Sequence, residues 1–163
     1  WDILDAAAGK PVVIFSQFRT VIHAIGALLR VKADPWYRDV AMIHGGVKNV
    51  VRTEQVRQFQ AGERRVFLAT IATGGVGITL PASDTVILWD KPWNPATVNQ
   101  AVDRLHRIGA KHESINVFSL LCADSVEWRI ERILESKDSL FKDVIDEAAV
   151  MGRLGREAMR RIV

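Results

Sequence analysis

Short apolar runs alternate with helical patterns along most of this chain, and the alternation limits the possible folds more than any other feature. The runs are rich in β-branched residues and bounded by polar or glycine-rich residues, as buried strands are. Between them, apolar residues recur every three or four positions, as in an amphipathic helix. The predicted strands cover residues 12–15, 40–43, 66–69, 85–89 and 115–121. This order predicts an α/β fold with a mainly parallel sheet.

Residues with known capping preferences mark where several helices begin and end. Asn49 is a good N-cap for a helix over residues 49–60. Asn94 followed by Pro95 starts another helix, which Gly109 can end. A short helix or lead-in is predicted over residues 1–10, and helices over 21–29 and 137–149. Another helix, with an apolar stripe that reaches Leu134, is capped by either Asp124 or Ser125.

Composition permits a nucleic-acid partner and argues against several other classes. The 163 residues are 48% apolar and 25% charged, with a net charge of +3, as in a mildly basic soluble globular protein. Cys122 is the only cysteine, so no internal disulfide can form, and no Cys/His cluster has the spacing of zinc ligands. No apolar run reaches the ~18 residues of a membrane span. Because the chain starts at Trp1, we expect a piece of a longer protein, with one domain over residues 1–150 and a basic tail, helical or disordered, over 151–163.

Three polar or glycine-rich segments come directly after predicted strands. They are residues 16–19, 44–46 and 70–77. Ligands of parallel α/β sheets bind beyond the carboxyl ends of the strands, so these segments should lie along one edge of the sheet. The sequence therefore predicts a binding site at that edge.

The segment 100–109, Gln-Ala-Val-Asp-Arg-Leu-His-Arg-Ile-Gly, carries a charged helix face. Four of its polar residues are three or four positions apart and share one side of the predicted helix: Gln100, Asp103, Arg104 and Arg107. Two guanidinium groups suit a phosphate-rich ligand, because each presents a planar fork of donors to phosphate oxygens. The alternative is a solvated, salt-bridged helix surface.

Residues 73–80 form a glycine-rich loop in which backbone N–H groups can approach an anion. A purely structural turn is the alternative. A dinucleotide fingerprint does not fit, because Leu80 and Pro81 stand where a third glycine should open a helix. No P-loop is present, and Asp146-Glu147 is interpreted as a helix end rather than a magnesium-binding box. The chain therefore has no site to hold Mg–ATP alone.

Trp93, His44 and His106 are further candidates for ligand contact. An indole in the turn over residues 91–95 can stack on a base, but packing under the loop is an equal alternative. Each histidine can contact a ligand or can simply be packed or hydrogen-bonded. No Ser-His-Asp or Cys-His arrangement can be argued from the spacing, and no metal site is expected.

Taken in order, these segments resemble the second RecA-like domain of Swi/Snf-family ATPases, within helicase superfamily two. The resemblance extends from about Lys10 to about Asp146. The matching blocks are Phe-Ser-Gln-Phe at 15–18, His-Gly-Gly at 44–46 with Arg52 and Phe59, residues 73–80 with 84–87 and 90–95, and residues 100–109. Ordered blocks at the right intervals are more specific than any single motif.

The resemblance implies a RecA-like three-layer sandwich that works with a preceding first lobe. That first lobe would hold most of the ATP and Mg²⁺, and this lobe alone would bind no cofactor and no metal. Arg104 and Arg107 would be arginine fingers that reach the ATP. The glycines Gly75 and Gly77 would couple the state of the ATP to DNA. The polar residues Gln100 and Asp103 would organise the arginine face. The implied cofactor-binding positions are Gly75, Gly77, Gln100 and Asp103.

The resemblance also implies double-stranded DNA as a partner that lies across both lobes. The positions that would face it are Ser16, Gln17, His44, Gly45, Thr73 and Trp93. The other partner would be the first RecA-like lobe of the same protein, with no membrane contact and a monomeric state. The location would be nuclear in a eukaryote and cytoplasmic in a prokaryote or a virus.

We therefore predict the second motor lobe of an ATP-dependent DNA translocase of the Swi/Snf family. The complete protein would be a DNA-dependent ATPase, and the isolated lobe would not hydrolyse ATP. Two alternatives stay open: a non-catalytic nucleic-acid binding module with the same fold, and the corresponding lobe of an RNA-directed helicase. An upstream segment with Gly-Lys-Thr and Asp-Glu boxes would decide against the binding module.

Overall fold

The structure is a computed structural model that describes residues 1–32, 35–74, 78–92, 94–103, 105, 112, 114–126, 128–130 and 132–133. The chain divides into two compact units, Trp1–Leu120 and Leu121–Val163, and every described strand belongs to the first. The domain boundary predicted between residues 150 and 151 lies outside the described residues. No helix within the described ranges is long and apolar enough to span a membrane.

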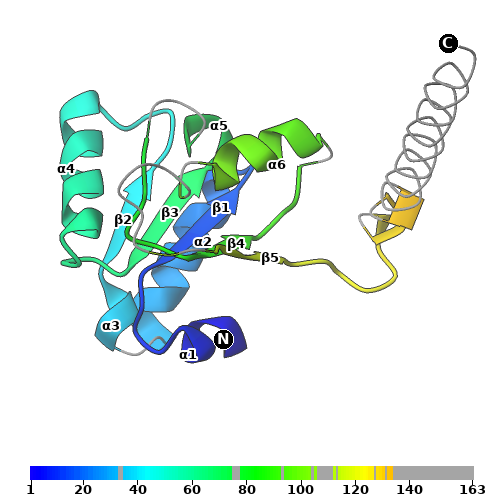
Figure 1. The fold of residues 1–163 in the computed structure, drawn as a ribbon, viewed down its shortest axis with the longest axis horizontal. Coiled ribbons are helices and arrows are strands. Elements are labelled where there is room, and N and C mark those ends of the chain that lie inside the picture. Colours follow the sequence, from blue (N-terminus) through cyan, green and yellow to red (C-terminus); the bar gives the residue numbers. More distant parts are fainter. Residues whose placement is uncertain are drawn as a thin grey trace, which may run out of the picture. The chain divides into compact units, whose positions relative to one another are not determined.

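The sheet of the first unit has five strands, which pair in parallel throughout in the order β2-β3-β1-β4-β5 (Figure 1). The strands are β1 (Val12–Ser16), β2 (Val40–Ile43), β3 (Val66–Thr70), β4 (Thr85–Leu88) and β5 (Asn116–Ser119). Each of them overlaps its predicted range. The prediction of an α/β fold with a mainly parallel sheet is therefore confirmed.

Helices cover both faces of this sheet and complete three layers (Figure 1). One face carries α1 (Asp2–Ala7), α2 (Arg19–Lys32) and α3 (Pro35–Arg38), and the other carries α4 (Asn49–Gln60), α5 (Ile71–Gly74) and α6 (Pro95–Val102). Successive side chains of a strand point to opposite faces, so each strand supplies two cores. On β1, Phe15 packs in one core with Phe59 of α4, whereas Ile14 packs in the other with Ile22 of α2. This is the predicted RecA-like sandwich.

The predicted cap of α6 is confirmed, whereas the predicted cap of α4 is wrong. The side chain of Asn94 caps α6 as predicted, accepting a hydrogen bond from the N–H of Ala96 at 3.0 Å, and Pro95 is the first helical residue. In α4, however, Asn49 is already the first helical residue. Lys48 takes the extended backbone conformation of a cap and contributes no side-chain bond. The cap of α4 is therefore Lys48, one residue before the predicted cap Asn49.

Two predicted boundaries near the expected site are also wrong. The helix α6 ends at Val102, with Asp103 as its C-cap, rather than at Gly109. The side chain of Leu105 is fully buried in the core, and its N–H donates to the carbonyl of Val102 at 2.9 Å in a tighter turn. Packing of this leucine thus accompanies an early end to the regular helix. The polar or glycine-rich segment predicted over residues 70–77 starts with the short helix α5, which also covers the first two residues of the loop predicted over 73–80.

The second unit contains the start of the helix that was predicted after residue 124. Ser125 is its cap, because the Ser125 Oγ accepts a hydrogen bond from the N–H of Trp128 at 3.2 Å. The guanidinium of Arg132 lies 5.0 Å from the ring centre of Trp128, which is a cation–π contact. The helix predicted over 137–149 and the tail over 151–163 lie outside the described residues.

Candidate nucleic-acid interface

The carboxyl ends of three neighbouring strands bring the predicted binding segments together. The strands β2, β3 and β1 are adjacent, and the register sets Ile43 level with Ala69 and Ser16 level with Thr70. The segments that follow these strand ends form one edge of the sheet, called the rim here: residues 16–19, 44–46 and 70–73. The prediction that these segments share an edge is confirmed for the described residues.

A buried carboxylate, Asp90, holds the turn that follows β1. Its Oδ2 accepts a short hydrogen bond from the Ser16 hydroxyl, and its Oδ1 accepts one from the N–H of Gln17. The Ser16 oxygen also accepts the N–H of Phe18 at 3.0 Å. Hydrogen bonds to an ionised carboxylate are roughly twice as strong as neutral ones, so Asp90 fixes the backbone of this part of the rim. Asp90 was not among the predicted site residues. The available signal was a single acidic residue soon after a buried apolar strand.

The predicted DNA-facing residues of the rim occupy two depths. Ser16 has no exposed surface, and Thr73 is nearly buried. The Thr73 hydroxyl accepts a hydrogen bond from that of Thr70 at 2.8 Å, across the start of α5. Gln17 and Gly45, in contrast, are exposed. His44 is buried as well, with 7% of its surface exposed. Ser16 and Thr73 can shape the rim from below, and Gln17 and Gly45 can meet a ligand directly.

A basic cluster of Arg19, His23 and His44 lies at the end of the rim that is next to β2. The ring centroids of His23 and His44 are 5.2 Å apart, and Arg19 Nε donates to His23 Nε2 at 3.5 Å. A Cβ atom at Gly46 would lie only 3.2 Å from His44 Cε1 and 3.5 Å from Arg19 Nη1, so a glycine lets the cluster close up. Arg19 and His23 were not predicted as site residues. Their spacing of four on α2, directly after a rim segment, was the available signal.

His44 is a neutral hydrogen-bond donor within this cluster. Burial lowers the pKa of His44 below its usual 6.5, and the nearby charges of Arg19 and His23 lower that pKa further. The His44 Nδ1 accepts the N–H of Gly46 at 3.1 Å, which assigns the ring proton to Nε2. His44 can therefore donate a hydrogen bond from Nε2, as a phosphate oxygen requires.

The predicted arginine face is described only in part. Gln100 on α6 and the C-cap Asp103 are both exposed. Six other candidates lie outside the described residues: Gly75, Gly77, Trp93, Arg104, His106 and Arg107. Within the described part of the chain, no group of three or more His, Cys, Asp and Glu side chains could hold a metal ion.

Comparison with known proteins identifies the family. The model of the helicase conserved C-terminal domain matches residues 1–109, which is more than half of the chain. The chain belongs to this family. Residues 1–109 include every rim segment.

Several curated relatives are similar to most of this chain. The human DNA excision repair protein ERCC-6-like is 38% identical over 141 residues, which is 85% of this chain and 11% of that protein. The nuclear protein STH1/NPS1 of Saccharomyces cerevisiae is 37% identical over 81% of this chain and 10% of its own length. The chromatin-remodeling ATPase INO80 of Drosophila melanogaster is 34% identical over 85% of this chain and 8% of its own length. The chain thus spans about a tenth of the length of these relatives.

A solved structure has the same fold. The C-terminal part of the Fun30 ATPase domain superimposes with a TM-score of 0.69 at 27% identity, covering 80% of this chain and 40% of that chain. Together with the curated relatives, this similarity confirms the resemblance to Swi/Snf-family ATPases that the ordered motifs predicted.

Proposed function

We propose that this chain is the second motor lobe of an ATP-dependent DNA translocase of the Swi/Snf type. The observation that carries the proposal is the rim, where three segments at the strand ends place the exposed amide of Gln17 and a basic cluster along one edge. Such groups suit a phosphate backbone, which proteins contact through backbone N–H groups and cationic or polar side chains. Two similar proteins are named as ATPases, which supports ATP hydrolysis by the complete protein.

In this proposal the rim carries part of the DNA track. Gln17 and Gly45 are exposed and would contact the duplex directly, and His44 would donate from Nε2 to a phosphate oxygen. Ser16 is buried and would act through the turn that Asp90 fixes. Thr73 would also act indirectly, by holding the start of α5 through its hydrogen bond with Thr70. Trp93 would face the duplex, as the resemblance implies.

The chemistry in this proposal is charge stabilisation during phosphoryl transfer. The first lobe would hold ATP and Mg²⁺, and this lobe would supply Arg104 and Arg107 to the charge that develops on the γ-phosphate. An arginine finger of this kind is worth roughly 10³–10⁵ in rate. Gln100 and Asp103 lie at the C-terminal end of α6 and would orient the arginine face. Gly75 and Gly77 would link the ATP cleft to the DNA track.

The partners and the location follow from the same proposal. The chain would close against the first RecA-like lobe of its own protein and bind double-stranded DNA, and the protein would act as a monomer. Among the similar proteins, those from cattle, Arabidopsis thaliana and Saccharomyces cerevisiae are eukaryotic, and the yeast protein is named a nuclear protein. We therefore assign the protein to the nucleus.

DNA-stimulated ATP hydrolysis by the complete two-lobe protein tests the proposal. Arg104→Ala and Arg107→Ala should each lower kcat by roughly 10³ or more, while ATP affinity changes little, because the first lobe makes most ground-state contacts. Arg→Lys should restore little activity, since lysine lacks the planar fork. Arg38→Ala on α3 is the matched control and should keep normal turnover. Normal kcat in both finger variants, with unchanged melting curves, would rule out the assignment.

A further inference from the structure

A second basic surface lies beside the edge strand β2 and is not part of the rim. A groove of about 520 Å³ runs between α2 and α4, within the range of about 300–1,000 Å³ typical of ligand sites. Its polar lining is His23 and Arg30 of α2, Gln55 of α4 and Arg64, the residue two before β3. We propose that this groove, called the β2 groove here, binds a backbone phosphate of the DNA that lies on the rim. The proposal rests on the proposed function of the rim.

Two backbone groups of the β2 edge already have side-chain partners, which disfavours one class of partner. The N–H of Met42 donates to Gln55 Oε1 at 3.1 Å, and the carbonyl of Val40 accepts from Arg64 Nη1. Arg64 Nη1 also donates to Gln55 Oε1 at 3.2 Å. A peptide strand would need those same backbone groups in order to extend the sheet. We therefore expect the occupant to bind to the side chains of the groove, two of which are the arginines Arg30 and Arg64.

The groove offers a cation that is available to a ligand. Among the described residues, the Arg30 guanidinium has no hydrogen bond or ion pair. The Arg64 guanidinium is held in place by Val40 and Gln55, so it lines the groove in a fixed position. A fixed guanidinium loses little conformational freedom when it binds an anion. No carboxylate is among the residues that line the groove.

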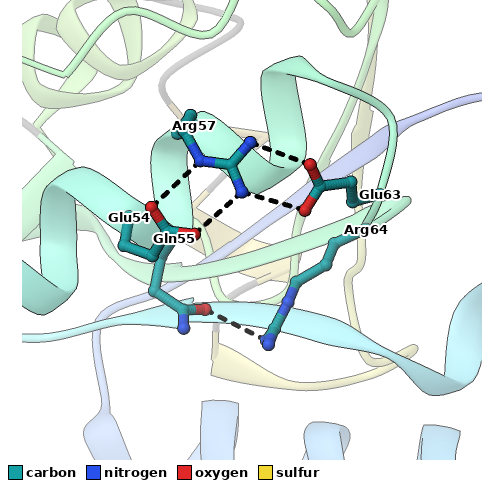
Figure 2. Close-up of polar contacts among 5 residues, drawn as sticks. All are labelled: Glu54, Gln55, Arg57, Glu63 and Arg64. Atoms are coloured by element: carbon teal, nitrogen blue, oxygen red, sulfur yellow. Dashed lines mark hydrogen bonds and ion pairs between the residues drawn. The ribbon is translucent and has the colours of Figure 1, made fainter.

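The nearby carboxylates are held by another arginine (Figure 2). Arg57 donates to Glu54 from Nε at 3.0 Å and from Nη2 at 2.8 Å, and it donates to Glu63 from Nη1 at 2.8 Å. These hydrogen bonds are the main reason why the pKa values of Glu54 and Glu63 are lowered. The same close-up shows the guanidinium of Arg64 beside the Gln55 amide, whereas both carboxylates point to Arg57. The carboxylates of Glu54 and Glu63 are thus paired with Arg57. Without this pairing they would compete with a phosphate for Arg64 or repel the phosphate.

The β2 groove is continuous with the rim through His23. This residue lines the groove, and its ring also contacts that of His44 in the basic cluster, with the centroids 5.2 Å apart and the planes tilted by 54°. Arg19, His23 and Arg30 are four and seven residues apart, so they share one side of α2. At 1.5 Å per residue, Arg30 is about 10 Å along the helix from His23, which is about three nucleotides along one DNA strand. Gly26 lies between them, where a Cβ atom would meet Met42 Cε at 2.8 Å, so glycine keeps α2 close to the strand.

The salt dependence of duplex binding by this chain tests the proposal. The logarithm of the binding constant falls with the logarithm of salt concentration, with a slope of about −0.9 for each phosphate that is neutralised. Arg30→Gln should make this slope shallower by about 0.9 and weaken binding several-fold for a short random-sequence duplex. Arg30→Lys should keep the wild-type slope, because a point charge still neutralises the phosphate.

Lys10→Gln is the matched control, because it also removes one positive charge from an exposed side chain. Lys10 precedes β1 and pairs at 3.8 Å with Asp84, which precedes β4, so the pair lies at the amino ends of the strands, opposite the rim. Its slope should equal that of the wild type. If Arg30→Gln and the wild type have equal slopes while the wild type binds DNA, the proposal that the β2 groove binds a phosphate is wrong. The proposed DNA track on the rim is unaffected by that result.

Two further outcomes are informative. No salt-sensitive duplex binding by the wild type overturns both the groove and the proposed function. Binding of poly-glutamate that Arg30→Gln abolishes, combined with an unchanged slope for DNA, assigns the groove to an acidic peptide and overturns the phosphate proposal. Melting curves of all the variants should match, since Arg30 is exposed and makes no described bond.

Discussion

The strands β2 and β5 form the two edges of one sheet, but their surroundings differ sharply. On β2 the backbone groups of Val40 and Met42 are bonded by side chains that come from outside the strand. Three of its four residues are buried. On β5 all residues are exposed, including Val117 at 43% and Phe118 at 40%. The two edge strands, Val-Ala-Met-Ile for β2 and Asn-Val-Phe-Ser for β5, thus lie in opposite environments.

This difference shows that burial of an edge strand is decided by what packs over it. The edge β2 is covered because α2 and α4 flank it, and Gln55 and Arg64 reach its backbone. An open edge is a template for pairing with other chains, and side-chain bonds of this kind remove that hazard. The covered edge also leaves a charged groove beside it, where a ligand can bind without joining the sheet.

The largest expected effect separates the interior of the sheet from its open edge. Phe67 on β3 is fully buried and lies 5.2 Å, centroid to centroid, from Phe59. Phe67→Ala should lower the free energy of unfolding by about 3–5 kcal/mol, because it leaves a cavity in the core. Phe118→Ala on β5 removes the same side chain from an exposed site and should cost under about 1 kcal/mol. Denaturant unfolding of both variants measures the contrast, and equal losses would show that β5 is as well packed as β3.

A smaller effect is expected from the bonds that cover the β2 edge. Gln55→Ala removes the acceptor for the N–H of Met42 and for Arg64, which should cost about 1–2 kcal/mol. Asn116→Ala on β5 is the matched change, and it should cost about 0.5 kcal/mol or less, because Asn116 is exposed. Urea midpoints of the two variants give the comparison. A loss for Asn116→Ala as large as that for Gln55→Ala would remove the distinction between the two edges.

The sequence was sufficient to predict the strands. It was also sufficient to predict that the segments after them lie along one edge of the sheet. Apolar runs such as residues 66–69 are buried on both faces of a parallel sheet, so they are continuous in the sequence and easy to recognise. The residues after each strand then lie at one edge because parallel strands all point the same way. The cap at Asn94 was also readable, since capping is local.

Features that depend on distant contacts could not be predicted. Asp90 acts on Ser16, which is far away in the sequence, and only the pairing of β1 with β4 brings them together. The early end of α6 accompanies the burial of Leu105 in the core. The exposure of β5 depends on which elements pack over that edge, and the apolar run over residues 115–121 does not reveal this.

The central claim is that the rim, and not the rest of the sheet, carries the DNA track. The most direct measurement is the duplex affinity of two amide-to-acid variants, each of which adds one negative charge. Gln17 is exposed on the rim, and Asn116 is exposed at the opposite end of the strands, on β5. Gln17→Glu should weaken binding about tenfold, which is about 1.4 kcal/mol, because a carboxylate would face the phosphates, whereas Asn116→Asp should change it less than about twofold. Equal affinities for the two variants would contradict a DNA track on the rim.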